Sequence, residues 1–221
     1  MKIFALDTST EAICVGYTDG QNFYSMNYFG VEKHAVKLAP LVNDFLKLCD
    51  VKVSDIDVFG CGIGPGSLTS LRIGLAFVQA MACVTSKPIV PVVSSKVVAM
   101  NLSGCEQDVV IVKKAREGFV YISCYRSLQE VLAPSVLEIE KAFDILRNFK
   151  DPVVVGDAAH MFESVALVGK KELQYPRGEF LLHEVMQNFK ANVVRKPHEV
   201  EPLYLQKSIA EMNLEKRLKG Q

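Results

Sequence analysis

The stretch that decides the fold runs from Asp57 to Val84 and reads DVFGCGIGPGSLTSLRIGLAFVQAMACV. It begins as an apolar strand, breaks into a glycine-rich turn over residues 62–69, and continues as a helix from Ser70. Such a turn exposes backbone N–H groups at the start of the helix, a geometry that suits phosphate or carboxylate binding. Between Arg72 and Val84 the helix has one polar side chain, Gln79, so it must be covered on more than one face. Its own sheet is one cover, and a second protein is a candidate for the other.

The segments on either side of this stretch predict an alternating α/β unit. Runs of strand-forming residues, which short turns join into an antiparallel meander, lie at 2–7, 12–17 and 22–29, and a further strand lies at 89–93. Residues 32–49 carry apolar side chains at intervals of three and four, which predicts a helix. Pro40 should either kink this helix or place its start later. With a helix at 96–102, the first hundred residues read β-β-β-α-β-α-β-α.

A polar, glycine-containing segment at residues 101–107 is the predicted domain boundary. We expect an N-terminal domain at 1–103, a smaller C-terminal α/β domain at 104–200, and a terminal segment at 201–221 that packs back on the first domain. The second unit should contain strands at 108–113, 119–125, 130–139 and 152–155, and helices at 140–149 and 178–190. A charged terminal helix is expected at 208–218.

Composition limits the class of protein. The 221 residues carry no net charge, which argues against a self-sufficient nucleic-acid binder. The six cysteines form no C-x-x-C pair, and the four histidines lie far apart without metal-ligand spacing. The N-terminus enters a strand at once, and no apolar run reaches membrane-spanning length. These features predict a cytoplasmic protein with reduced thiols.

Two turns could bind a ligand, and each has a plainer explanation. Asp7 and Thr8 at the end of the first strand could orient a metal-bound phosphate, or could form an Asx turn with capping hydroxyls, which the residues alone favour modestly. The turn Gly64–Thr69 lacks the P-loop lysine, and it is equally an anion-binding turn or a tight turn with a helix cap.

Charged residues near these turns are also open to two interpretations. Arg72 lies in the first helical turn, where the dipole disfavours a cation, so it needs a compensating anion from a partner, a ligand or, most commonly, an internal salt bridge. His34 is more often structural than a ligand when no second ligand is nearby. The basic cluster Lys113–Arg116 could touch RNA phosphate or, as is usual, be solvated.

Taken together, these stretches resemble the TsaB (YeaZ) family, the small partner subunit in bacterial synthesis of N6-threonylcarbamoyladenosine on tRNA. The resemblance covers nearly the whole chain. Its signposts are Leu6-Asp7-Thr8-Ser9, His34 ahead of Leu41, the block GPGSLTSLRIG at 64–74, Ala115-Arg116 followed by Val120-Tyr121, and Glu201-Pro202-Leu203-Tyr204-Leu205. The family usually has Phe, Gly, Asp and Arg at the positions of Leu68, Ser70, Lys114 and Gln206. Lys114 weakens any claim that an acid at its position does chemistry.

The resemblance implies an actin/hexokinase-like (ASKHA) α/β fold with two related β-β-β-α-β-α-type domains, the second degenerate. The catalytic relative TsaD carries an H-x-x-x-H metal pair, and the matching positions here are Ser94 and Val98. Valine cannot ligate a metal, so we expect neither a catalytic metal centre nor catalytic residues in this chain.

By the same resemblance, the chain should be a non-catalytic subunit that binds and activates TsaD, with the ATPase TsaE joining them. It should form a homodimer when alone and meet tRNA only through the complex. The expected partner-binding residues, on the helices at 32–49 and 70–84, are His34, Leu38, Leu41, Phe45, Leu71, Arg72, Gly74, Leu75 and Val78. The small residues Gly74, Ala76 and Ala80 would allow close helix approach.

Nucleotide, if any, should be ATP or ADP bound only together with partners, because no cofactor is expected to bind this chain tightly. The residues expected near it are Asp7, Thr8, Gly64, Gly66, Ser67 and Thr69. Two enzymatic alternatives are a metallopeptidase, against which the absent metal pair argues, and a sugar-kinase-like phosphotransferase, against which the lack of a glycine-rich hairpin after Asp7 argues. A direct tRNA-binding module is a third alternative that zero net charge disfavours.

Overall fold

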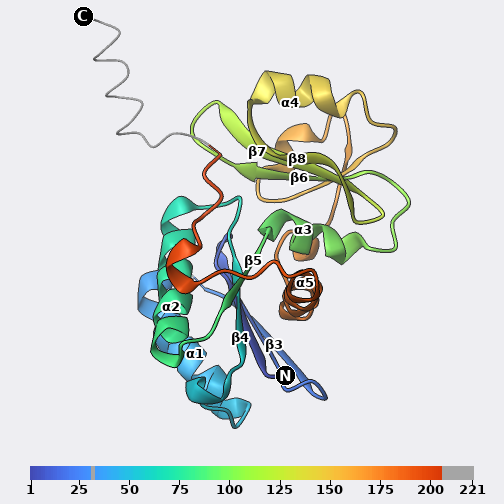
Figure 1. Cartoon of the computed structure of the whole chain (residues 1–221). Helices are drawn as coiled ribbons and strands as arrows, with labels where there is room; N and C mark the ends of the chain where they lie inside the picture. The colour runs from blue at the N-terminus through green and yellow to red at the C-terminus, as the bar shows by residue number, and fades with distance from the viewer. Residues whose placement is uncertain (31–32, 206–221) are drawn as a thin grey trace, which may run out of the picture.

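The computed structural model describes residues 1–30 and 33–205, which form two mixed five-stranded sheets (Figure 1). The helix predicted at 208–218 lies outside the described residues. The strands are β1 (Ile3–Asp7), β2 (Ala12–Thr18), β3 (Phe23–Phe29), β4 (Val58–Gly62), β5 (Ile89–Val92), β6 (Val109–Lys114), β7 (Phe119–Arg126), β8 (Gln129–Glu138), β9 (Val153–Val155) and β10 (Leu167–Val168). The helices are α1 (His34–Leu48), α2 (Leu68–Thr85), α3 (Ser94–Ala99), α4 (Ile139–Leu146) and α5 (Gly178–Lys190). Short 3-10 turns lie at Val53–Asp55 (η1), Met100–Leu102 (η2), Ala159–Phe162 (η3), Lys171–Leu173 (η4) and Pro197–Glu199 (η5).

The first sheet has the strand order β3-β2-β1-β4-β5. Its first three strands are antiparallel neighbours, and β1, β4 and β5 pair in parallel. The element order predicted for the first hundred residues is confirmed, because the chain runs β1-β2-β3-α1-β4-α2-β5-α3. Parallel pairing of β1 with β4 places the carboxyl ends of these two strands, and the turns that follow them, at one edge of the sheet.

The second sheet repeats this plan with the order β8-β7-β6-β9-β10. Its first three strands are again antiparallel, and β9 pairs in parallel with both β6 and β10. The long helix α2 of the first unit has only the 3-10 turn η3 as its counterpart between β9 and β10. The expected actin/hexokinase-like fold of two related units, the second degenerate, is confirmed by this repeat.

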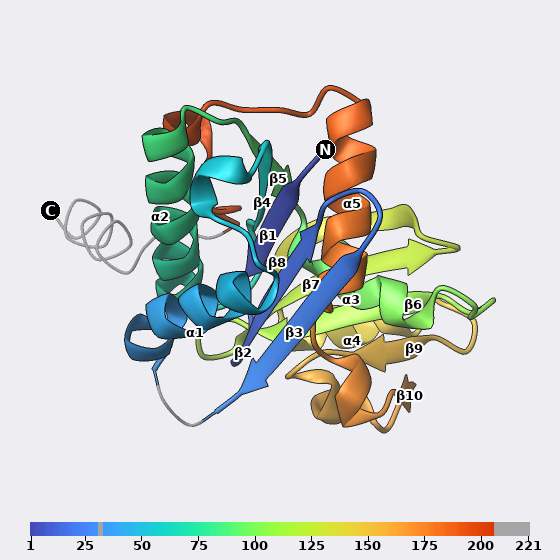
Figure 2. The ribbon, with the colours of Figure 1, turned by 90° about the horizontal axis from the view of Figure 1, so that it is seen from below.

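Helices cover both faces of the first sheet, as Figure 2 shows from below. Side chains alternate along β1, so Phe4 and Leu6 pack with α1 and α2 on one face, while Ile3 and Ala5 pack with α5 on the other. Helix α5 was predicted to belong to a domain at 104–200, and its packing on the first sheet corrects that boundary. The apolar stripe of an amphipathic helix shows which side is buried but not which sheet it covers.

The segment after α5 also returns to the first unit. Val200 lies in the core cluster of α1 and α2, and the backbone N–H of Leu203 donates to the carbonyl oxygen of Ile63 at 2.8 Å. Helix α2 is the one helix in the described part of the chain that is long and apolar enough to cross a membrane, judged by length and composition only. Here it packs against β4, α1 and η5 instead.

Candidate functional site

The candidate site is built where the turn after β1 meets the turn after β4. Asp7 ends β1, and its Oδ1 accepts a hydrogen bond from the backbone N–H of Ser9 at 2.7 Å. The N–H of Ser67 donates to the carbonyl of Ser9 at 3.2 Å. A backbone hydrogen bond therefore holds the two turns together, and the Asx-type arrangement at Asp7 that the sequence favoured is present.

The start of α3 closes the same site from a third side. The N–H of Gly64 donates to Ser94 Oγ at 3.0 Å, and the N–H of Ser94 donates back to the carbonyl of Gly64 at 2.7 Å. Ser94 is fully buried, so its hydroxyl serves this turn. Val98, one helical turn later, packs in a cluster with residues of the second sheet.

Thr8 connects the site to helix α2. Its Oγ1 donates to the carbonyl of Ser70 in the first turn of α2 at 2.7 Å. A Cβ added to Gly74 would lie 2.2 Å from the same Oγ1, so the glycine is needed for Thr8 to approach the helix. Gly74 was expected to allow a partner helix to approach. The structure corrects that expectation, because the space beside Gly74 is filled by Thr8 of the same chain.

A lysine from the second sheet completes the site. Lys113, on β6, is 2% exposed, and its Nζ donates to Ser9 Oγ and to the carbonyl of Pro65, each at 3.0 Å. Burial lowers the pKa of Lys113, and the carboxylates of Asp7 and Asp157 act in the opposite direction. The basic cluster was expected to be solvated or to touch RNA, and for Lys113 this is wrong because its side chain lies inside the protein.

Most of the residues expected near a nucleotide therefore lie close together, but they are buried away from solvent. Asp7 and Thr8 are each 1% exposed, and Gly64 and Gly66 are buried beside them. Ser67 caps α2 by accepting from the N–H of Ser70 at 3.4 Å, whereas Thr69 points to solvent. A nucleotide near these residues stays a prediction.

Most of the residues expected to bind a partner face inward. The buried ones are His34, Leu38, Phe45, Leu71, Gly74, Leu75 and Val78. They pack on the sheet or on neighbouring turns, so they cannot form the outer surface of α1 and α2. Leu41 is half-buried and Arg72 is exposed. His34 Nε2 lies 3.1 Å from the carbonyl of Glu11, which fits the structural role considered from the sequence.

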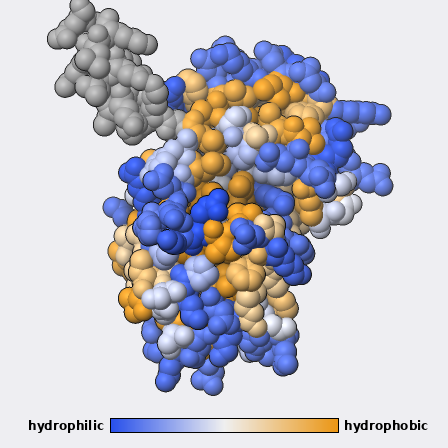
Figure 3. All heavy atoms as spheres, viewed as in Figure 1, coloured by the Kyte–Doolittle hydropathy of each residue, from blue (hydrophilic) through white to orange (hydrophobic). Residues whose placement is uncertain are grey.

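The outward face of α2 carries other residues. At 100° per residue, the positions opposite the buried Leu71, Val78 and Ala82 form a stripe without charge. We call this the outer stripe, and it consists of the exposed Thr69, Ala76, Ala80, Cys83 and Val84, with Ile73 half-buried at its edge, where it packs on the core. Val84 is 87% exposed, and Figure 3 shows apolar residues at the left edge of the lower half, where Figure 1 draws α1 and α2.

The flanks of α2 are occupied by the chain itself. Phe77 and Met81 pack on the core cluster that α1 shares with α2, and Gln79 Nε2 donates to the carbonyls of Pro197 and Val200 at 2.7 and 3.0 Å. The guanidinium of Arg72 lies over the ring of Tyr204, 5.7 Å from its centroid. The expected internal salt bridge of Arg72 is not present among the described residues, and the aromatic ring takes its place.

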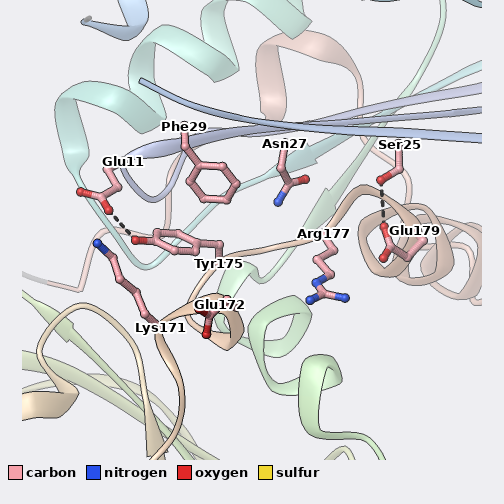
Figure 4. Close-up of a pocket in the computed structure, with 9 residues that line it drawn as sticks. All are labelled: Glu11, Ser25, Asn27, Phe29, Lys171, Glu172, Tyr175, Arg177 and Glu179. Atoms are coloured by element: carbon pink, nitrogen blue, oxygen red, sulfur yellow. Dashed lines mark hydrogen bonds between the residues drawn. The ribbon is translucent and has the colours of Figure 1, made fainter. Parts of the chain in front are cut away.

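An open cavity of about 550 Å³, which the sequence did not predict, lies beside β3 (Figure 4). Tyr175 donates a hydrogen bond to the carboxylate of Glu11 and packs edge-on against Phe29, with 4.8 Å between ring centroids. The other residues that line the cavity are Ser25, Asn27, Lys171, Glu172, Arg177 and Glu179. They come from segments about 150 residues apart, and neither segment has a motif that would have signalled the cavity. In the described ranges, no three His, Cys, Asp or Glu side chains are grouped to hold a metal ion.

Known proteins resemble this chain over most of its length. The family model of TsaD, tRNA N6-adenosine threonylcarbamoyltransferase, matches residues 24–207. The tRNA threonylcarbamoyladenosine biosynthesis proteins TsaB of Haemophilus influenzae and Escherichia coli are each 25% identical, over 95% of this chain and 95% and 96% of their own. The solved structure of YeaZ from Pseudomonas aeruginosa superposes with a TM-score of 0.79 at 25% identity, covering 92% of this chain and 99% of that one.

Proposed function

Because its match spans residues 24–207, the chain belongs to the family of TsaD, tRNA N6-adenosine threonylcarbamoyltransferase, and we propose that it is the non-catalytic subunit that binds and activates the TsaD catalytic subunit. The relatives from Haemophilus influenzae and Escherichia coli, which match over 95% of this chain, carry the name TsaB and are named for threonylcarbamoyladenosine biosynthesis. In this role the chain supports transfer of a threonylcarbamoyl group to adenosine in tRNA, in the cytoplasm, and meets the tRNA only within the complex.

The observation that carries this proposal is the outer stripe. A free chain leaves the uncharged outer stripe of α2 exposed beside Arg72, and α1 carries exposed apolar residues of its own such as Val36, which is 65% exposed. A contiguous apolar face of this kind is typical of a protein–protein interface. TsaD covers it in the complex, a second copy of this chain covers it when the chain is alone, and TsaE joins the assembly. ATP or ADP binds only in that complex.

The surface is tested with one charge at its centre. Ala80 is exposed in the middle of the stripe, so Ala80→Glu would place a carboxylate in an apolar contact without a partner. We expect TsaD affinity to fall at least about tenfold, which corresponds to about 1.4 kcal/mol. The matched control is Ala133→Glu, the same change at an exposed position on β8 of the second sheet. If both variants bound TsaD with equal affinity, the docking surface would not lie on α2.

The function is tested by reconstitution. Modified tRNA should form from the purified components only when this chain is present. Product formed at the same rate without it would contradict the proposal, whatever the binding data show. The non-catalytic role is tested separately by metal analysis and ATP-binding calorimetry on the purified chain. A tightly bound zinc or iron ion, or ATP turnover by the chain alone, would contradict it.

A further inference from the structure

A buried lysine joins the two units at the candidate site. Lysine is almost never fully buried without a partner. Lys113 donates hydrogen bonds to two turns of the first unit, at the hydroxyl of Ser9 and the carbonyl of Pro65. The carboxylates of Asp7, from the first of these turns, and of Asp157, from the second unit, are the charges that act on it. Lys113 itself comes from β6 of the second unit, more than 100 residues away from Ser9. One ammonium group therefore connects the second sheet to the turn that precedes α2.

The acid at this site needs a cation. Asp7 is 1% exposed, and its Oδ2 is buried without a hydrogen-bond partner in the part of the chain that the structure describes. A buried carboxylate without a positive neighbour is costly. Its negative charge also raises the pKa of the thiols of Cys14 and Cys61, after burial, which is the larger cause for both.

Space around the acid is already filled. A Cβ on Gly62 would lie 2.0 Å from Asp7 Oδ2, and a Cβ on Gly66 would lie 2.0 Å from the carbonyl oxygen of Ser9. The actin/hexokinase-like fold implies a magnesium–nucleotide between the two units. The residues present do not fit that group here, because the packed turns take the space beside Asp7 Oδ2, and the Lys113 ammonium is already bonded to Ser9, the residue whose N–H is bonded to Asp7 Oδ1.

We propose that Lys113, bonded to Ser9, whose N–H is bonded to Asp7, is the built-in counter-charge of the buried Asp7 carboxylate, so that this site takes neither a metal ion nor a nucleotide, and that it fixes the start of α2 relative to the second sheet. It acts as a positioning residue, because it touches Pro65 and Ser9 and no reacting group. This inference concerns the isolated chain and does not depend on the proposed partner.

The first test is a double-mutant cycle on thermal unfolding of the whole chain. Lys113→Met keeps the length of the side chain but leaves Asp7 without its cation, and we expect the midpoint to fall by more than about 5 °C. Adding Asp7→Asn should recover at least half of that loss, because the double variant has no unpaired charge. The control is Lys114→Met, the neighbouring and exposed lysine of β6, which should change the midpoint little. Strictly additive losses for Asp7→Asn and Lys113→Met would overturn the proposal.

The second test asks which cations the site accepts. In Lys113→Ala, ethylammonium chloride should raise the midpoint more than sodium chloride at the same concentration, and it should not do so in the unmodified chain. The unmodified chain should show no midpoint shift with magnesium chloride or magnesium–ATP. The measurement with magnesium chloride and magnesium–ATP needs no variant, so it tests whether the site takes a metal ion or a nucleotide even if the lysine variants do not fold. A magnesium–ATP shift that Asp7→Asn abolishes would show that the site takes the nucleotide, and the proposal would be wrong.

Discussion

Replacing Gly74 by alanine is the sharpest test of how α2 is seated. The added methyl group would lie 2.2 Å from Thr8 Oγ1, 2.9 Å from its Cγ2 and 3.1 Å from its Cβ. Thr8 cannot turn away freely, because it is β-branched, buried and bonded through Oγ1 to the carbonyl of Ser70. Either α2 shifts away from the turn after β1, or that hydrogen bond breaks.

The size of the effect follows from three contributions. Overpacking a well-packed site costs about 1–3 kcal/mol. Loss of the Thr8 hydrogen bond inside the protein costs about 1 kcal/mol. Alanine in place of glycine within a helix returns about 1 kcal/mol. The free energy of unfolding should therefore fall by about 1–3 kcal/mol, which lowers the thermal midpoint of a chain of this size by roughly 2–12 °C.

The assay is urea unfolding followed by circular dichroism, with two companion variants. Thr8→Ala removes the atoms that collide, so the double variant Thr8→Ala/Gly74→Ala should be less destabilised than the sum of its single changes. Gly104→Ala is the control, because nothing lies within 4 Å of the position of its added Cβ. If Gly74→Ala matched that control, or if the losses at positions 8 and 74 simply added, the reasoning about this contact would be refuted.

Three further predictions concern other parts of the molecule. Asn101 Nδ2 donates to the carbonyls of residues 173 and 175, so Asn101→Ala should speed amide hydrogen exchange across 171–176, with exchange elsewhere unchanged. Cys83 is exposed on the outer stripe, so a thiol reagent should label it before the buried cysteines. Bound TsaD should slow this labelling. Labelling of Cys83 at the same rate with TsaD bound would count against the docking surface. Burial raises the pKa of the Tyr125 hydroxyl from 10 to about 12, so the unfolded chain loses this proton at a lower pH than the folded chain does. The free energy of unfolding should therefore fall above about pH 10, by up to ~1.4 kcal/mol per pH unit for this group. Urea midpoints from pH 7 to 11 should show the fall, and Tyr125→Phe should make it shallower.

The sequence was informative where local pattern and topology agree. Strand-forming runs, the short turns that join them and the helical spacing at 32–49 predicted the first unit in the correct order, because each element buries one face in a regular period. Helix α5 shows the limit of this reasoning. Its stripe predicted a helix at 178–190 with the correct bounds, but nothing in the stripe says that it crosses back to the first sheet.

The site was harder to predict, and for a physical reason. A helix that is apolar all round has no periodic contrast, so the sequence could not show which residues of α2 face inward. Lys113 did carry a signal that was available. Consecutive residues of a strand point to opposite faces, so one of the pair Lys113–Lys114 had to point toward a covered face of the sheet. The neighbouring valines and isoleucine of β6 already indicated that both faces are covered.

Folding alone does not account for the composition of α2. Its inward face packs on the first sheet, one flank packs with α1, and the other gives Gln79 to the carbonyls at 197 and 200. Polar residues on the remaining face would cost the fold nothing, and isolated exposed apolar residues need no explanation. The outer stripe is different, because it runs for about four turns, from Thr69 to Val84, without a charge of its own. Thr8 and Lys113 meanwhile fix the start of this helix from the inside. A rigidly seated helix with an uncharged outer face is what a docking surface requires, since little conformational freedom is then lost when the partner binds.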